Sequence, residues 1–172
     1  MDALSVEECR RFLTVARESE WYAPFALALT TGMRPSEYLA VKWSDIDWQR
    51  GAASVCRTIQ TSVSGWTFYD TKRKRSRRVV KLQNFVLEAL GDLGGQRETE
   101  HDLVFHKGGQ PLRQRKIKVE FRRLLAAAGV SVKVISDQLG HASISFTLER
   151  YSHVLPSIQD EAAAKVERML IG

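Results

Sequence analysis

The sequence has 172 residues, a net charge of +6 and a pI of about 9.5. Its hydrophobic content of 44% and charged content of 27% are ordinary for a soluble globular protein, and the length suits a single domain over residues 1–172. The first residues, MDALSVEECRRF, do not form a signal peptide, and no apolar run approaches the length of a membrane span. We therefore expect a cytoplasmic protein with no membrane partner.

Two helices are expected at the start of the chain. Ser5 followed by Glu8 is a capping-box pattern, and the apolar residues after it recur on one helical face. This predicts an amphipathic helix over residues 5–19. The stretch WYAPFALALTT, residues 21–31, is apolar enough for a buried helix, which Gly32 would end.

A short helix and a small sheet are expected next. Pro35 can open a helix that runs through Ala40. Three stretches rich in β-branched and aromatic residues follow, with turn-forming residues between them. They predict one small antiparallel sheet made of Ala53–Ile59, Gly65–Asp70 and Arg77–Leu82.

The remainder is predicted to be mainly helical. Asn84–Leu90 is a short helix, and Asp102–Phe105 is one more strand, closed by a turn at 106–111. From Gln114 onward the patterns predict only helices, at 114–128, 131–139, 144–151 and 156–170. The fold class is therefore mainly α with a small antiparallel β-sheet (α+β). The C-terminal helix, 157–172, could dock on its own domain or on a neighbouring subunit.

Positive charge is concentrated in two places. The segment TKRKRSRRVVK, residues 71–81, contains no acid, and the stretch around residues 113–123 is also basic. Each could be an ordinary solvated surface. Together they favour a DNA-binding surface, because cations that neutralise phosphates release condensed counterions. The candidate DNA contacts are Arg73, Lys74, Arg75, Arg77, Arg78, Arg115, Lys118, Arg122 and Arg123.

Two further stretches could carry chemistry. In TTGMRPSE, Arg34 stands at a sharp start of a short helix, where its fork could bind a phosphate, and Glu37 one turn later could orient it. An ordinary surface Arg–Glu pair has the same spacing. In LGHASISFTLERYSH, Tyr151 lies ten residues after His141, beside Arg150 and near His153. It is either a core or interface tyrosine or a nucleophile whose phenolate is stabilised by neighbouring cations.

These pieces together resemble the tyrosine recombinase (phage integrase) family. The resemblance is carried by TTGMRPSE with VKWSDID, by TKRKRSRRV, by LVFHKGGQPL and above all by LGHASISFTLERYSHVLP. It extends from about Leu4 to Pro156, and the order and spacing of the motifs make it specific. It implies the catalytic-domain fold of that family and a DNA strand-exchange reaction.

The resemblance also implies residue roles. Tyr151 would attack the scissile phosphate and form a 3′-phosphotyrosyl link, and Lys72 would protonate the leaving 5′-oxygen. Arg34 and His141 would hold the non-bridging oxygens, with Glu37 and His153 in support. No metal or cofactor is expected, because the bond energy is kept in the phosphotyrosine. In agreement, Cys9 and Cys56 lack metal-like spacing and no phosphate-binding glycine loop is present.

One family feature has no counterpart in this sequence. The family carries a His-x-x-Arg box, which supplies a second clamping arginine, on a helix before Leu-Gly-His. None of the four histidines here has an arginine three residues later. We infer an internal deletion at Gly129–Val130 that leaves an internally truncated domain of doubtful activity. One of the nearby basic residues, Arg115, Lys118, Arg122 or Arg123, could instead approach the phosphate.

The resemblance also bears on DNA binding and assembly, and two alternative functions fit the same sequence. The family's N-terminal DNA-clamping domain has no counterpart here, so binding to DNA should be weak, and a functional form should act as a homo-oligomer on DNA. The chain could also be a relic that binds DNA without cleaving it. Finally, LLAAAGVSVKVISDQLG resembles a repressor helix-turn-helix, which would place Ser131, Lys133, Ser136 and Gln138 in the major groove.

Overall fold

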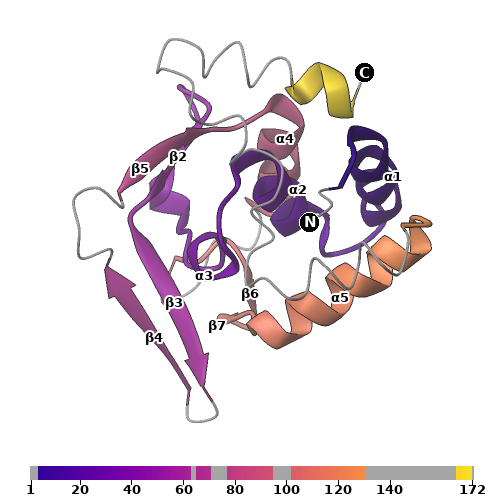
Figure 1. Ribbon diagram of the computed structural model, residues 1–172. Helices are drawn as coiled ribbons and strands as arrows, with labels where there is room; N and C mark the ends of the chain where they lie inside the picture. Colours follow the sequence, from indigo (N-terminus) through magenta and orange to yellow (C-terminus); the bar gives the residue numbers. More distant parts are fainter. Residues whose placement is uncertain (1–3, 63–64, 71–76, 95–101, 131–165, 172) are drawn as a thin grey trace.

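The computed structural model describes residues 4–62, 65–70, 77–94, 102–130 and 166–171. It has a helical body edged by small antiparallel sheets of two or three strands (Figure 1). The body consists of α1 (Val6–Ala16), α2 (Tyr22–Thr31), α4 (Asn84–Asp92) and α5 (Gln114–Ala127). Phe12, Phe25 and Phe121 join α1, α2 and α5, with ring centroids 5.1 to 5.5 Å apart. This architecture confirms the predicted class, mainly α with small antiparallel β elements. None of the described helices is long and apolar enough to cross a membrane.

The first two helices begin and end through local signals. At the start of α1 the Ser5 hydroxyl accepts a hydrogen bond from the Glu8 backbone N–H at 3.2 Å, and the Glu8 carboxylate accepts one from the Ser5 N–H at 2.8 Å. The helix ends at Ala16, three residues before the prediction, because the chain turns to bury Trp21. Helix α2 ends at Gly32, whose φ of 66° suits a residue without a Cβ.

Helix α3 (Pro35–Tyr38) is a single turn held down by its apolar residues. It ends two residues before the predicted Ala40. Tyr38 and Leu39 are fully buried, and the Tyr38 ring meets Phe105 edge-on at 6.3 Å between centroids. The position of this short turn is therefore fixed by the core rather than by its own helix propensity.

The strands of the described residues form three separate antiparallel sheets, so the prediction of one sheet was wrong. β1 (Ile46–Asp47), β2 (Ala52–Val55) and β5 (Arg78–Lys81) form one antiparallel sheet. β3 (Arg57–Ser62) pairs with β4 (Gly65–Asp70) in a hairpin that projects from the body. The predicted strand Ala53–Ile59 is divided at Cys56.

The register explains this division. Arg57 lies opposite Asp70, whereas Val55, two residues earlier, lies opposite Arg78. In one continuous antiparallel ladder the partners of Val55 and Arg57 would be two residues apart, but Arg78 and Asp70 are eight residues apart. β4 therefore pairs with β3, and β5 pairs with the preceding strand β2 (Figure 1). In the sequence, residues 71–77 join β4 to β5.

The region 102–111 also differs from the prediction. Asp102–Phe105 is not a strand: among its residues Leu103 alone forms an isolated bridge, with Lys42. The predicted turn at 106–111 contains two short strands, β6 (His106–Lys107) and β7 (Gln110–Pro111). They can reverse tightly because Gly108 and Gly109 both adopt positive φ.

Helix α5 confirms the predicted helix 114–128, and its end is well defined. The N–H of Gly129 donates to the carbonyl of Ala126 at 3.0 Å, and the N–H of Val130 donates to that of Leu125 at 3.1 Å. With a φ of 69° at Gly129 and a buried Val130, this is a Schellman motif. The predicted helices 131–139 and 144–151 lie outside the described residues. Of the predicted helix 156–170, residues 166–170 are described and are helical.

Residues 166–170 lie beside α1 of the same chain (Figure 1). The Arg10 side chain donates a hydrogen bond to the Met169 carbonyl, and Leu170 packs against the core.

Candidate functional site

The site is centred on Glu37, a buried carboxylate that binds three groups. Its side chain is 6% exposed and accepts two parallel hydrogen bonds from the Arg78 guanidinium, each 2.9 Å long. One of its oxygens also accepts a hydrogen bond of 2.8 Å from the backbone N–H of Arg34. The Arg34 guanidinium is more distant, at 3.7 Å between Nη1 and Oε1. Glu37 therefore orients Arg34 mainly through the main chain.

These contacts keep Glu37 ionised. Burial pushes the pKa of Glu37 upward, because it removes water from the charged form. The hydrogen bonds from Arg78 and from the Arg34 backbone, with the charges of both arginines, outweigh that effect and hold the pKa below its ordinary value. A carboxylate that stays charged keeps both arginines in place.

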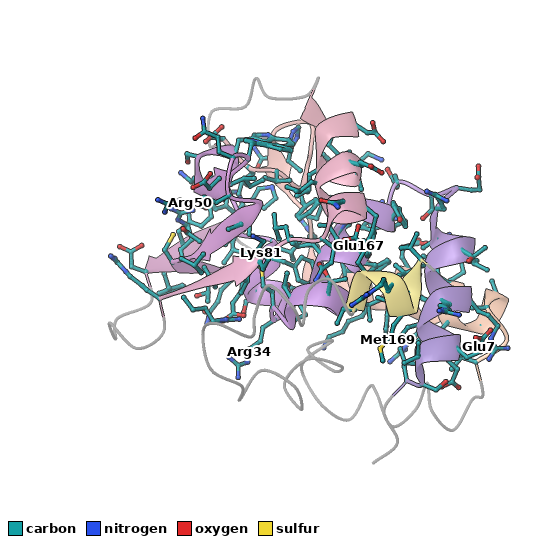
Figure 2. All side chains as sticks on the ribbon, turned by 90° about the horizontal axis from the view of Figure 1, so that it is seen from above. Glu7, Arg34, Arg50, Lys81, Glu167 and Met169 are labelled. Atoms are coloured by element: carbon teal, nitrogen blue, oxygen red, sulfur yellow. The ribbon has the colours of Figure 1, made fainter. Side chains whose placement is uncertain are left out.

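Arg34 presents its charge to solvent. Its side chain is 60% exposed and points away from the ribbon (Figure 2). It follows Met33, which is fully buried, and it directly precedes α3, so its backbone is fixed on both sides. An exposed guanidinium on a fixed backbone is the arrangement expected for a residue that binds a phosphate oxygen.

The predicted basic segment is described at its C-terminal end alone. Arg77 is exposed, and Arg78 opens β5 and turns its guanidinium to Glu37. Lys72, Arg73, Lys74 and Arg75 lie outside the described residues. The segment nevertheless leaves β4 and enters β5 at fixed points, and the second of these points is bonded to the residue that orients Arg34.

Helix α5 carries a second basic surface. Arg115, Lys118, Arg122 and Arg123 are all exposed on it, and Arg123 pairs with Glu120 at 2.8 Å. The opposite side of the helix, with Ile117, Phe121 and Leu125, is buried in the core. Exposed cations on a rigid helix suit contacts to a nucleic-acid backbone.

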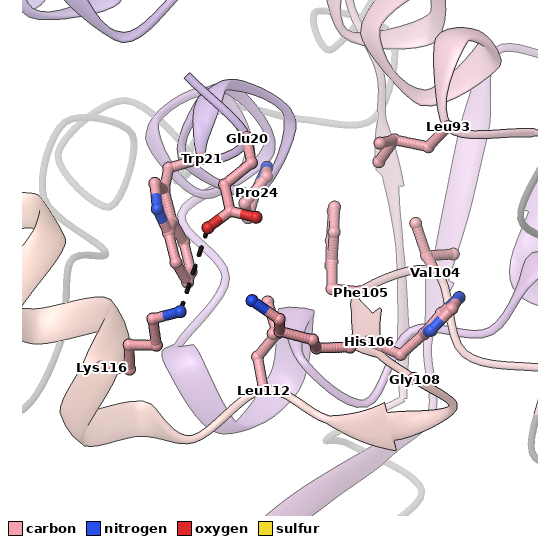
Figure 3. Close-up of a pocket in the computed structure, with 11 residues that line it drawn as sticks. Glu20, Trp21, Pro24, Leu93, Val104, Phe105, His106, Gly108, Leu112 and Lys116 are labelled. Atoms are coloured by element: carbon pink, nitrogen blue, oxygen red, sulfur yellow. Dashed lines mark ion pairs between the residues drawn. The ribbon is translucent and has the colours of Figure 1, made fainter.

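Lys116 is directed elsewhere. It lines a pocket of about 260 Å³, together with Glu20, Trp21, Phe105, His106 and Leu112 (Figure 3). Its ammonium lies 3.9 Å from a Glu20 oxygen and 5.1 Å from the centroid of the Trp21 ring. These contacts hold Lys116 against the two residues that precede α2.

Several predicted site residues cannot be placed. His141, Tyr151 and His153 lie outside the described residues, so the structure does not test whether they approach Arg34. Within the described ranges, no group of three or more His, Cys, Asp or Glu side chains could hold a metal ion.

A second arrangement of the same kind was not predicted. The carboxylate of Asp45 in η1 (Trp43–Asp45) accepts a hydrogen bond of 2.8 Å from the Lys42 N–H and pairs with Arg57 from β3. The acid at the third position after Lys42 was a visible signal for the first contact. The arginine could not be identified without the three-dimensional structure.

Comparison with known proteins decides the family. The profile of the phage integrase family matches residues 3–131, which is most of the chain. The chain belongs to the phage integrase family. Among its relatives are a XerC-like tyrosine recombinase from Caldanaerobacter subterraneus, 24% identical over 215 residues, and the ICEBs1 integrase from Bacillus subtilis, 26% identical over 197 residues. These alignments cover 99% and 95% of this chain and 55% and 54% of the relatives. The integrase-family chain thus spans about half the length of these relatives.

Solved structures show the same fold for this phage integrase family member. XerA recombinase superposes with a TM-score of 0.62 at 23% identity, covering 96% of this chain and 63% of its own. The Tn1549 transposon integrase, in complex with a circular intermediate DNA, superposes with a TM-score of 0.59 at 19% identity, covering 98% of this chain and 66% of its own. The fold is therefore that of the tyrosine recombinase catalytic domain.

Proposed function

We propose that this chain is the catalytic part of a site-specific DNA recombinase that cuts and rejoins DNA strands through a 3′-phosphotyrosine. One observation carries the proposal: Arg34 is fixed by a buried, ionised Glu37 and still presents an exposed guanidinium. Membership of the phage integrase family and relatives called recombinase and integrase support it. Because the substrate is DNA, the chain would work in the cytoplasm.

The reaction needs four groups in defined roles. The Tyr151 hydroxyl releases its proton to solvent and its oxygen attacks the scissile phosphorus, so that a P–O bond forms to tyrosine and the bond to the 5′-oxygen breaks. The leaving oxygen takes its proton from Lys72. Arg34 and His141 stabilise the charge on the non-bridging oxygens, supported by Glu37 and His153. Reversal with another 5′-hydroxyl rejoins the strand, so neither a metal nor a nucleotide is required.

The DNA surface would combine the basic segment with α5. Arg73, Lys74, Arg75 and Arg77 would contact the backbone from one side, and Arg115, Lys118, Arg122 and Arg123 from the other. Such contacts set affinity and register rather than sequence choice. Recombination joins two DNA sites, so the active form would be a homo-oligomer on DNA.

We also propose that activity is impaired by loss of the His-x-x-Arg box at Gly129–Val130. The family match stops at residue 131, next to this junction. The alignment with the XerC-like recombinase is 215 residues long, although this chain has 172, which supports a missing internal stretch. Loss of one preorganised donor costs about 10²–10³ in rate, and an arginine at the phosphate is worth roughly 10³–10⁵.

A phosphorothiolate-bearing suicide substrate tests the proposal. Cleavage should leave a protein–DNA adduct at Tyr151, detected by denaturing gel and peptide mass analysis, and Tyr151→Phe should form none. A chain that binds the DNA but forms no adduct is a non-catalytic relic. A helix-turn-helix regulator would instead protect a defined palindrome and would do so equally well with Tyr151→Phe.

A further inference from the structure

The strongest contact in the site comes from a residue to which the reaction assigns no role. Arg78 binds both oxygens of Glu37 at 2.9 Å, from a strand 41 residues further along the chain. A bidentate arginine–carboxylate pair of this kind is strong and fixes orientation as well as distance. The Arg78 side chain is 38% exposed, whereas the Glu37 side chain is 6% exposed, so the pair is anchored at its carboxylate end.

The pair determines where Glu37 places its second oxygen. Glu37 Oε2, which accepts a hydrogen bond from Arg78 Nη2, also accepts one of 2.8 Å from the N–H of Arg34. A buried carboxylate without a cation is unfavourable and would either take up a proton or move toward water. Either change weakens the bond to the Arg34 backbone.

Arg78 also joins two parts of the site. It is the first residue of β5 and directly follows the basic segment 71–77, which contains Lys72. Its bond to α3 therefore fixes the point at which that segment enters the sheet, next to the turn that carries Arg34.

We propose that Arg78 is a positioning residue that acts through Glu37 to hold Arg34 in the geometry for phosphate binding. This inference rests on the proposed recombinase function. Arg78 was predicted to contact DNA directly. The role proposed here is indirect, because the Arg78 guanidinium donates hydrogen bonds to the Glu37 carboxylate.

The first test needs no catalysis. In Arg78→Met, carboxyl and amide NMR should show a higher pKa for Glu37 and a shifted, faster-exchanging Arg34 amide. Arg57→Met is the matched control, because it removes the arginine from the equivalent pair at Asp45 and leaves Glu37 intact. Unchanged Glu37 and Arg34 signals in Arg78→Met would overturn the proposal.

The second test uses the suicide substrate with variants confirmed to be folded. Arg78→Met should slow adduct formation about 100-fold, as expected for a reacting group displaced by about 1 Å, and Arg57→Met should slow it far less. The double variant Arg78→Met with Glu37→Gln should recover most of the rate, because the unpaired buried charge is gone and the glutamine oxygen can still accept the Arg34 N–H.

The outcomes separate the two proposals. A double variant as slow as Arg78→Met would mean that Arg78 acts on the DNA directly, which overturns the positioning role. Equal losses in Arg78→Met and Arg57→Met would reduce Arg78 to general stability, with the same consequence. If the unmodified chain forms no adduct, the recombinase function fails, and the NMR experiment still decides whether Arg78 holds Arg34.

Discussion

Two short helical turns of this chain are built in the same way and use their cations differently. Arg34 and Lys42 each precede a short turn, and each donates its backbone N–H to an acid three residues on, at 2.8 Å. Each acid is paired with an arginine from a strand, Arg78 at Glu37 and Arg57 at Asp45. Lys42 then rests over the Phe68 ring at 5.4 Å, whereas Arg34 reaches into solvent. The scaffold alone does not identify a functional residue; the direction of the side chain does.

The largest difference between the two turns should appear in catalysis. Arg34→Ala should lower adduct formation by roughly 10³–10⁵, because the phosphate loses its arginine. Lys42→Ala should lower it less than about tenfold, as the Lys42 ammonium packs on Phe68. Single-turnover assays with the suicide substrate measure both, and equal effects would remove the distinction drawn between the turns.

Removing Arg78 and removing Arg57 should both lower the free energy of unfolding. Arg78→Met and Arg57→Met each leave a buried carboxylate without its cation, and breaking a fully buried pair costs about 3–5 kcal/mol of unfolding free energy. The loss for Arg78→Met should lie below this range, because its side chain is 38% exposed and water screens the pair. Urea denaturation provides the comparison. A change below about 1 kcal/mol in either variant would show that its pair contributes no more than a surface ion pair.

The stability of the unmodified chain and that of Glu37→Gln should depend differently on pH in the acid range. The pKa of Glu37 is lowered in the folded state, so its contribution to stability is present above the unfolded value of about 4.3 and is lost as the pH falls through the folded value. The melting temperature of the unmodified chain should therefore fall more steeply below about pH 4 than that of Glu37→Gln. Parallel curves for the two proteins would indicate that the folded pKa is not lowered.

The smallest effect concerns the packing of Lys42. A cation over an aromatic ring at a partly exposed site contributes about 0.5–1 kcal/mol. A double-mutant cycle with Lys42→Met and Phe68→Leu should give a coupling energy of about that size. A coupling near zero would mean that Lys42 lies over the ring without being stabilised by it.

The sequence predicted those features that depend on local patterns. The apolar period predicted α1 nearly in full, the apolar run at 21–31 predicted α2, and Gly32 marked the end of α2 correctly. Arg34 and Glu37 were recognised as neighbours because they are three residues apart. What could not be predicted depends on distant partners: the division at Cys56 follows from the offset between Asp70 and Arg78, which pairing alone reveals.

Arg78 illustrates the same limit within the site. In the sequence Arg78 is one of several cations in a short basic segment, and no local pattern distinguishes it from Arg77. In the fold, alternation along β5 turns Arg78 toward Glu37 and leaves Val79 61% exposed. The apolar residue faces water and the charged one faces the body, contrary to the usual pattern, because a buried acid lies on that side.

The end of α5 has a consequence for engineering. Its stop is encoded by the last residues of the helix and by Gly129 and Val130, through hydrogen bonds that involve nothing further along the chain. Because these hydrogen bonds end the helix locally, its C-terminus should not depend on the sequence that follows Val130. The peptide bond between Val130 and Ser131 is therefore a suitable site for an insertion. A helix from a relative, carrying that relative's arginine, could be inserted there while the part of the domain before it keeps its fold.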